Sequence, residues 1–115
     1  MDSREMAKLA CAALEDKKAG DVRVIDISEI SVIADYFIIA DGENQNQLEA
    51  MRDAVDESLY KAGVHVKQVE GNHKSTWILM DYGDIIEHIF SKEDRFFYDL
   101  ERIWRDGKVI EAKEL

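Results

Sequence analysis

Several residues of this sequence are of the types that bind metal ions or transfer protons: Asp35, His73, Asp81, Asp84 and His88. Carboxylates and imidazoles that converge could hold a divalent cation or act as general acid and base. However, Asp81 and Asp84 flank a two-residue loop, where aspartates are common because their side chains bond local backbone groups. His88 lies on an expected strand and faces either solvent or a polar pocket. We therefore predict a turn here, with no metal site and no cofactor.

The sequence also gives little support for a catalytic nucleophile or a phosphate-binding site. Cys11 lies among alanines on the apolar side of an expected helix, where burial raises a thiol pKa and no nearby motif supplies a base. The loop Asp41-Gly42-Glu43-Asn44 joins a strand to a helix, but it has one glycine and two carboxylates that would repel a phosphate. We predict no catalytic residues. A metal-dependent, nucleotidyltransferase-like enzyme that uses Asp35, Asp81 or Asp84 is the alternative hypothesis.

The stretch Trp77–Tyr82 is unusual because it is apolar on both of its sides. Alternation along a strand puts Trp77 and Leu79 on one face and Ile78 and Met80 on the other. A helix of the same chain could cover either face. The other face could bind a protein partner, for which Trp and Tyr are favoured anchors. Both interpretations stay open at this point.

Apolar residues at spacings of three and four predict three helices that must support these strands. The first is capped by Asp2 or Ser3 and ends near Gly20, the second runs from Asn44 or Asn46 to Ala62, and the third follows Ser91 and ends at Asp106-Gly107. Their apolar stripes are Met6, Leu9, Ala10, Ala13 and Leu14; Leu48, Met51, Val55, Leu59 and Ala62; and Phe97, Leu100, Ile103 and Trp104.

Runs of β-branched and aromatic residues predict about five strands. They are Val22–Ile27, Tyr36–Ala40, Val64–Val69, Trp77–Tyr82 and Ile85–Phe90. The last two surround Tyr82-Gly83-Asp84 and should form an antiparallel hairpin, whereas a strand-helix-strand crossover favours a parallel pair. Between the first two runs, short polar residues predict a polar connection at 28–35. The fold class is α/β (α+β): a small single domain with a mixed sheet and helices packed on it.

Composition limits the setting and the partners. The chain has 115 residues, a net charge of −10 and one cysteine, which excludes an intramolecular disulfide. We expect one domain over residues 1–107, a charged C-terminal tail over 108–115, and a cytoplasmic protein without a membrane span. Residues 41–60 contain six acids and a single base, Arg52, which disfavours a grip on a nucleic-acid backbone and suits a basic protein partner. Alternatively, this acidic surface only maintains solubility.

Several segments in this order resemble the RsfS, or Iojap-like, family of ribosomal silencing factors. They are VIDIS, SVIADYFIIADG at Ser31 to Gly42, VEG at Val69 to Gly71, WILMDYGDIIEHIF at Trp77 to Phe90, and FYDLERIW at Phe97 to Trp104. The resemblance extends from about the first helix to Trp104. It implies a mixed-sheet fold similar to nucleotidyltransferases but without their catalytic residues.

The resemblance also implies a function and a set of partner-binding residues. Family members bind a large-subunit ribosomal protein at the intersubunit face and hinder joining of the small subunit, which lowers translation when nutrients are scarce. The positions carried over to this chain are Trp77, Leu79, Asp81, Tyr82, Gly83, Asp84 and His88. The chain departs from the family at Asp41-Gly42-Glu43-Asn44, which argues further against phosphate binding. The sequence leaves open whether the free protein is a monomer or a homodimer.

Overall fold

The computed structural model describes residues 1–71, 74–98, 107–111 and 114–115, with the backbone alone for 96–98. In chain order its elements are α1 (Ser3–Asp16), β1 (Gly20–Asp26), β2 (Tyr36–Gly42), α2 (Gln45–Lys61), β3 (Gln68–Glu70), β4 (Trp77–Asp81), β5 (Ile85–Ser91), α3 (Lys92–Tyr98) and β6 (Lys108–Ile110). No helix in these ranges is both long enough and apolar enough to cross a membrane.

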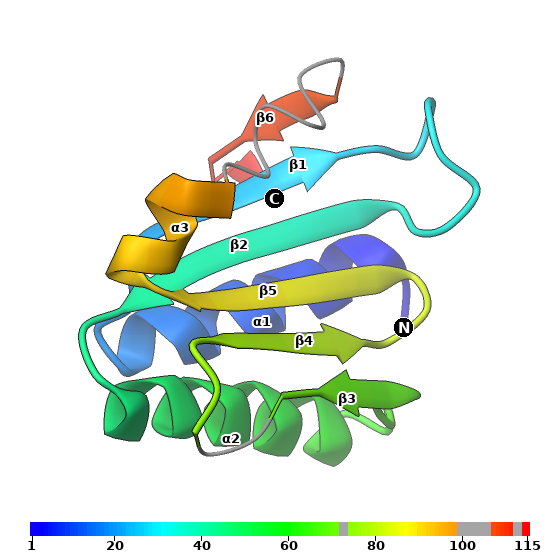
Figure 1. Ribbon diagram of the computed structural model, residues 1–115. Coiled ribbons are helices and arrows are strands. Elements are labelled where there is room, and N and C mark those ends of the chain that lie inside the picture. The colour runs from blue at the N-terminus through cyan, green and yellow to red at the C-terminus, as the bar shows by residue number, and fades with distance from the viewer. Residues whose placement is uncertain (72–73, 99–106, 112–113) are drawn as a thin grey trace.

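The described strands form one mixed sheet in the order β3-β4-β5-β2-β1-β6 (Figure 1). β2 pairs with β5 in parallel, and every other neighbouring pair is antiparallel. The predicted hairpin of β4 and β5 is confirmed, and so is the mixed sheet. The parallel pair joins β2 to β5 rather than to the next strand, because β3 lies at the far edge.

The sheet has six strands where the sequence predicted about five. The additional strand is β6, which lies in the segment expected to be a charged tail and pairs with β1 through Val24 and Ile110. Leu115 is also buried in the core. The expected strand over Val64–Val69 is shorter and later, since β3 begins at Gln68.

Helices α1 and α2 cover one face of the sheet, as Figure 1 shows. The predicted caps are present: Asp2 accepts a hydrogen bond from the Glu5 amide at 2.8 Å, and Asn44 accepts one from the Gln47 amide at 2.8 Å. Gly63 follows α2 with a φ of +88°, which suits a helix stop. Most of the predicted apolar stripe of each helix is buried against the sheet, whereas Leu9, Ala13 and Ala62 are only partly buried.

The opposite face of the sheet carries a second apolar layer. Its buried members are Ile25, Ile27, Ala34, Phe37, Ile39, Ile86 and Phe90, and Trp77 and Leu79 pack against them. β2 is therefore buried on both faces, as its apolar sequence predicted. Helix α3 begins where the sequence predicted, since Ser91 Oγ caps it by accepting a hydrogen bond from the Asp94 amide at 3.1 Å. Leu100, Ile103 and Trp104 lie outside the described residues, and so does the side chain of Phe97.

Glu87 on β5 has a buried carboxyl group between the sheet and the helices. Its side chain is 0% exposed, and neither carboxyl oxygen has a hydrogen-bond partner among the described residues. Burial raises the pKa of this carboxyl from 4.5 to about 8. Burial and then the nearby Glu87 charge raise the pKa of the Cys11 thiol, which fits the packing role expected for that cysteine.

We expect Glu87→Gln to stabilise the protein more at pH 8.5 than at pH 5.5. The native carboxyl keeps its proton up to about pH 8, whereas the ordinary value is 4.5. The unfolded chain therefore loses this proton first, and stability falls as the pH rises from about 4.5 to about 8. Because one pKa unit corresponds to about 1.4 kcal/mol, the gain in unfolding free energy at pH 8.5 should reach a few kcal/mol.

Urea unfolding at both pH values measures this effect. Glu43→Gln, which neutralises an exposed carboxylate, is the matched control and should change little. An equal effect of Glu87→Gln at the two pH values would contradict the prediction.

Candidate functional site

The side chains of β4 alternate between the two faces of the sheet. Ile78 and Met80 are buried against the helices, whereas Trp77, Leu79 and Asp81 are partly exposed on the opposite face. This is the division that strand alternation predicted. The partly exposed side chains of Trp77, Leu79 and Asp81 are called the β4 face below.

His88 on β5 lies beneath the β4 face. The Trp77 indole Nε1–H donates a hydrogen bond to His88 Nδ1 at 3.2 Å. Phe37 lies edge-on to the His88 ring with a centroid distance of 5.0 Å, and Trp77 stacks on Phe90 at 5.1 Å. The imidazole thus fixes one end of the Trp77 ring while aromatic rings support its surface.

Burial keeps His88 neutral. Its side chain is 5% exposed, and burial lowers the pKa of the imidazole from 6.5 to about 4. Since Nδ1 accepts a hydrogen bond, the proton of the neutral ring resides on Nε2, which is buried and has no hydrogen-bond partner in the part of the chain that the structure describes. His88 therefore acts on the β4 face through the Trp77 indole that it holds rather than by its own exposed surface.

The turn between β4 and β5 is held by local hydrogen bonds. Asp81 Oδ1 accepts the Gly83 amide at 2.7 Å, and the φ of Gly83 is +87°, a conformation that favours glycine. The Tyr82 hydroxyl donates to Asp56 Oδ1 on α2 at 3.1 Å. Tyr82 is 4% exposed and faces the helices, so it anchors the turn from below. Asp84 is exposed.

The structure brings only some of the acid-base candidates together. Asp84 and Asp35 are joined by a backbone hydrogen bond, in which the Asp35 amide donates to the Asp84 carbonyl at 2.8 Å. The Asp81 carboxylate is used by the turn, and His88 is buried. Among the described residues, no group of three or more His, Cys, Asp or Glu side chains could hold a metal ion. His73 lies outside those residues.

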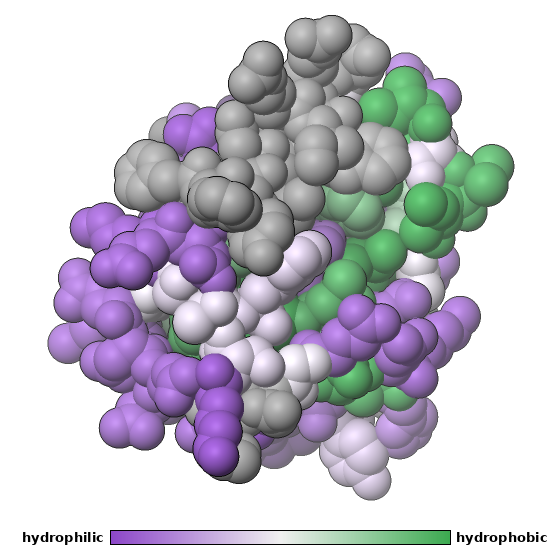
Figure 2. Space-filling model, viewed as in Figure 1, coloured by the Kyte–Doolittle hydropathy of each residue, from purple (hydrophilic) through white to green (hydrophobic). Residues whose placement is uncertain are grey.

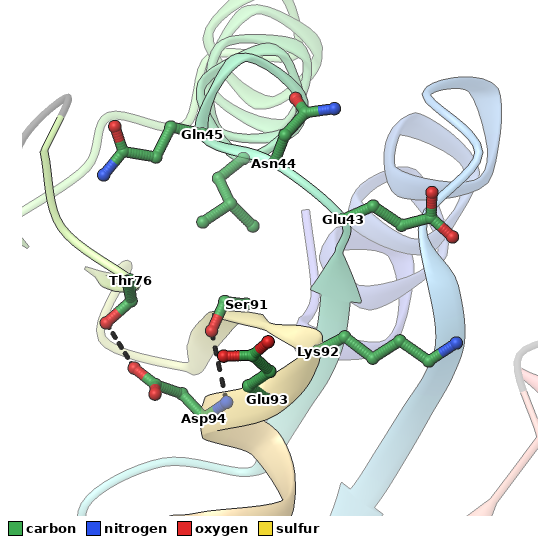
Figure 3. A pocket seen from close by; sticks show the side chains of 9 residues that line it. Glu43, Asn44, Gln45, Thr76, Ser91, Lys92, Glu93 and Asp94 are labelled. Atoms are coloured by element: carbon green, nitrogen blue, oxygen red, sulfur yellow. Dashed lines mark hydrogen bonds between the residues drawn. The ribbon is translucent and has the colours of Figure 1, made fainter.

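A groove of about 550 Å³ lies at the other end of the sheet, where the parallel strands β2 and β5 both end. Figure 3 shows Glu43, Asn44 and Gln45 at the start of α2, opposite residues of α3. Thr76 donates a hydrogen bond to Asp94 across its floor. Asn44 already caps α2, and the acidic groups Glu43, Glu93 and Asp94 outweigh the cation Lys92 in the groove lining, which makes the groove unsuited to phosphate.

Asp41 does not contribute to this repulsion as the sequence suggested, because it forms a buried ion pair. Arg95 Nη1 lies 3.0 Å from Asp41 Oδ2, and both side chains are about nine-tenths buried. Arg95 also donates to the Asp21 carbonyl. Gly20 permits this arrangement, since any side chain there would collide with the Asp41 carboxylate. The charge that opposes phosphate therefore comes from Glu43, Glu93 and Asp94.

Sequence reasoning did not anticipate the ion pair of Arg95 or the surface of the β1–β2 loop. Arg95 belongs to no recognisable sequence motif. Its partners Asp41 and Asp21 are distant in sequence, so no local pattern predicts the ion pair. The loop was expected to be polar, yet Ile30, Val32 and Ile33 are exposed there. The signal that could have found it is three large apolar residues within four positions of a segment otherwise composed mainly of short polar residues.

The sequence model of one family, described as "Ribosomal silencing factor during starvation" and abbreviated RsfS, matches residues 1–115 of this chain. This chain belongs to the RsfS family. The ribosomal silencing factor RsfS of Bacillus subtilis is 35% identical over 111 residues, which cover 96% of this chain and 94% of that protein. The chloroplastic protein Iojap of Arabidopsis thaliana is 32% identical, over 93% of this chain and 43% of its own length.

Solved structures agree with membership of the RsfS family. The crystal structure of a protein from Chromobacterium violaceum matches with a TM-score of 0.86 and 36% identity, over 90% of this chain and 87% of that one. The crystal structure of a protein from Bacillus halodurans matches with a TM-score of 0.82 and 33% identity, over 93% of this chain and 97% of that one. The resemblance to the RsfS family that the sequence shows is thus confirmed. The bacterial relatives are named as silencing factors, a name that describes a regulatory protein.

We expect His88→Leu to remove the acceptor of the hydrogen bond from the Trp77 Nε1–H, because leucine fills the buried position with an apolar side chain. His88→Asn should retain this interaction, since an amide oxygen can take the place of Nδ1. Loss of one such hydrogen bond costs about 1 kcal/mol. The indole N–H resonance of Trp77 in a ¹⁵N-labelled sample should shift in the Leu variant and stay near its original position in the Asn variant. An unchanged resonance in the Leu variant would show that the bond is absent in solution.

Proposed function

We propose that this protein represses translation in the cytoplasm by binding a basic protein of the large ribosomal subunit. It binds at the face that meets the small subunit, so that the two subunits cannot join. The observation that carries the proposal is the match of the whole chain to a family described as ribosomal silencing factors during starvation. Repression is then steric and requires no chemistry from this chain.

The β4 face supplies a surface with the composition of a protein interface. Trp77 and Leu79 are partly exposed apolar groups, and Asp81 adds a carboxylate at their edge. Trp is enriched among residues that contribute most to binding, and a polar rim gives orientation. His88, Gly83 and Tyr82 support this face from below or from the turn, and Asp84 is the exposed acid of the turn.

Charge favours a basic protein over bare RNA. The chain carries a net charge of −10, and a phosphate backbone would be repelled by such a surface. A basic ribosomal protein is attracted by the same charge, which accelerates encounter. Association should therefore weaken as the salt concentration rises.

Trp77→Ala should weaken binding to the large subunit while leaving a cooperative thermal transition. A residue that dominates an interface contributes about 2 kcal/mol or more, which corresponds to about a 30-fold loss of affinity. The loss of fold stability should be smaller than the about 3 to 5 kcal/mol of a fully buried tryptophan. Leu79→Ala should act in the same direction but less strongly.

Co-sedimentation with separated ribosomal subunits measures this binding. Tyr60→Ala removes an exposed aromatic residue from α2 and is the matched control. Equal recovery with small subunits, or no recovery with either, would refute the proposal. Normal binding by a folded Trp77→Ala protein would leave the large-subunit assignment intact but remove the role of the β4 face.

We expect no nucleotide transfer or hydrolysis by this protein. Replacing Asp35, Asp81 and Asp84 together by Asn should leave any activity of a preparation unchanged, because none of these carboxylates belongs to a metal-binding group among the described residues. The assay is turnover of labelled nucleotide with Mg²⁺ or Mn²⁺. A metal-dependent turnover that disappears in the triple variant would favour the alternative, a nucleotidyltransferase-like enzyme.

A further inference from the structure

The loop between β1 and β2 exposes apolar side chains that the fold does not use. Ile30 is 46% exposed, Ile33 is 61% exposed, and Val32 is fully exposed. In Figure 2 hydrophobic residues gather at the right-hand edge, where Figure 1 places this loop. Residues 28–33 are called the apolar loop below.

The backbone of the apolar loop is held in one conformation by hydrogen bonds at both ends. Asp26 Oδ1 accepts the Ser28 amide at 2.9 Å, and the Ile27 carbonyl accepts the amides of Ile30 and Ser31 at 3.1 and 2.9 Å. Ser31 Oγ accepts the Ile33 amide at 3.0 Å. Since the loop is already ordered, little conformational entropy is lost when a partner covers it.

The apolar loop is connected to the β4 face through the apolar layer on this side of the sheet. Ile27 and Ala34, which flank the loop, are buried in the same apolar layer against which Trp77 and Leu79 pack. A specific interface buries about 800 Å² on each partner, and the few partly exposed side chains of the β4 face fall short of that area. A partner seated on the β4 face therefore needs further contacts, and the apolar loop, whose flanking residues belong to the same apolar layer, offers exposed apolar side chains for them.

The charges around the apolar loop determine the kind of partner. The sequence has no Lys or Arg between Arg23 and Arg52, whereas Asp26, Glu29 and Asp35 lie in or beside the loop. A second copy of the chain would bring these acids face to face, and an anionic membrane would repel them. A protein with an apolar pocket would bury the apolar side chains of the loop, and a basic rim around that pocket would attract the neighbouring carboxylates.

We propose that the apolar loop inserts Val32 and Ile33 into an apolar, basic-rimmed pocket on the protein that the β4 face binds. The identity of that protein as a large-subunit ribosomal protein rests on the proposed function. The loop provides a second contact region on the same partner. Because its side chains are exposed in the free protein, their burial contributes to binding without being needed for folding.

The test is the double variant Val32→Ser with Ile33→Ser, which removes apolar groups without changing the charge. Its thermal transition should match that of the unmodified chain, and its affinity for isolated large subunits should fall at least about tenfold. The salt dependence of binding should stay the same, since no ionic contact is removed. Tyr60→Ser, at an exposed aromatic residue of α2 on the opposite face of the sheet, is the matched control and should bind normally.

The possible failures are distinguishable. If the unmodified chain binds large subunits and Trp77→Ala weakens this binding, but the double serine variant binds normally, the loop proposal is wrong and the proposed function stands. If the unmodified chain binds no large subunits, both are wrong. Self-association in sedimentation equilibrium, or binding to phosphatidylserine vesicles, that the double variant abolishes would identify a different occupant and overturn the proposal.

Discussion

The parallel pairing of β2 with β5 is the constraint on which the rest of the structure depends. The two strands are buried on both faces, and the antiparallel partners β1 and β4 attach at their outer edges. Because both run in the same direction, their carboxyl ends form the acidic groove and their amino ends lie beside the β4–β5 turn and the apolar loop. The proposed binding surface extends from the β4 face toward the amino ends of this pair.

The two faces of the sheet have different roles. The face under α1 and α2 contains most of the core. It also buries Glu87, whose carboxyl has no hydrogen-bond partner among the residues described, and such burial reduces stability. The other face combines apolar packing with a neutral histidine that orients Trp77. This arrangement lets the chain keep a large aromatic group partly exposed in a defined orientation, which a flexible loop would not achieve.

Sequence reasoning succeeded where the signal was local. The helix caps, the apolar stripes of α1 and α2 and the β4–β5 hairpin follow from spacing and turn residues, and these are present. It was incomplete where pairing is distant: β6 is short and its assignment depends on β1, and the partner of Asp41 is Arg95, far along the chain. Alternation separated Trp77 from Tyr82 correctly, but it could not show that Asp56 anchors the Tyr82 hydroxyl. The burial of Glu87 likewise depends on which strand occupies the centre of the sheet.

The parallel pair also determines the order in which the chain can fold. β1 and β2 are neighbours in sequence and can pair as soon as they are synthesised, and the same holds for β4 and β5. β2 cannot gain its second partner until the chain has been made as far as Ser91. During that interval its apolar edge has open backbone donors and acceptors. α1 and α2, which are complete earlier, can shield one side of this strand, so nascent chains truncated before β5 should be the aggregation-prone form of the protein.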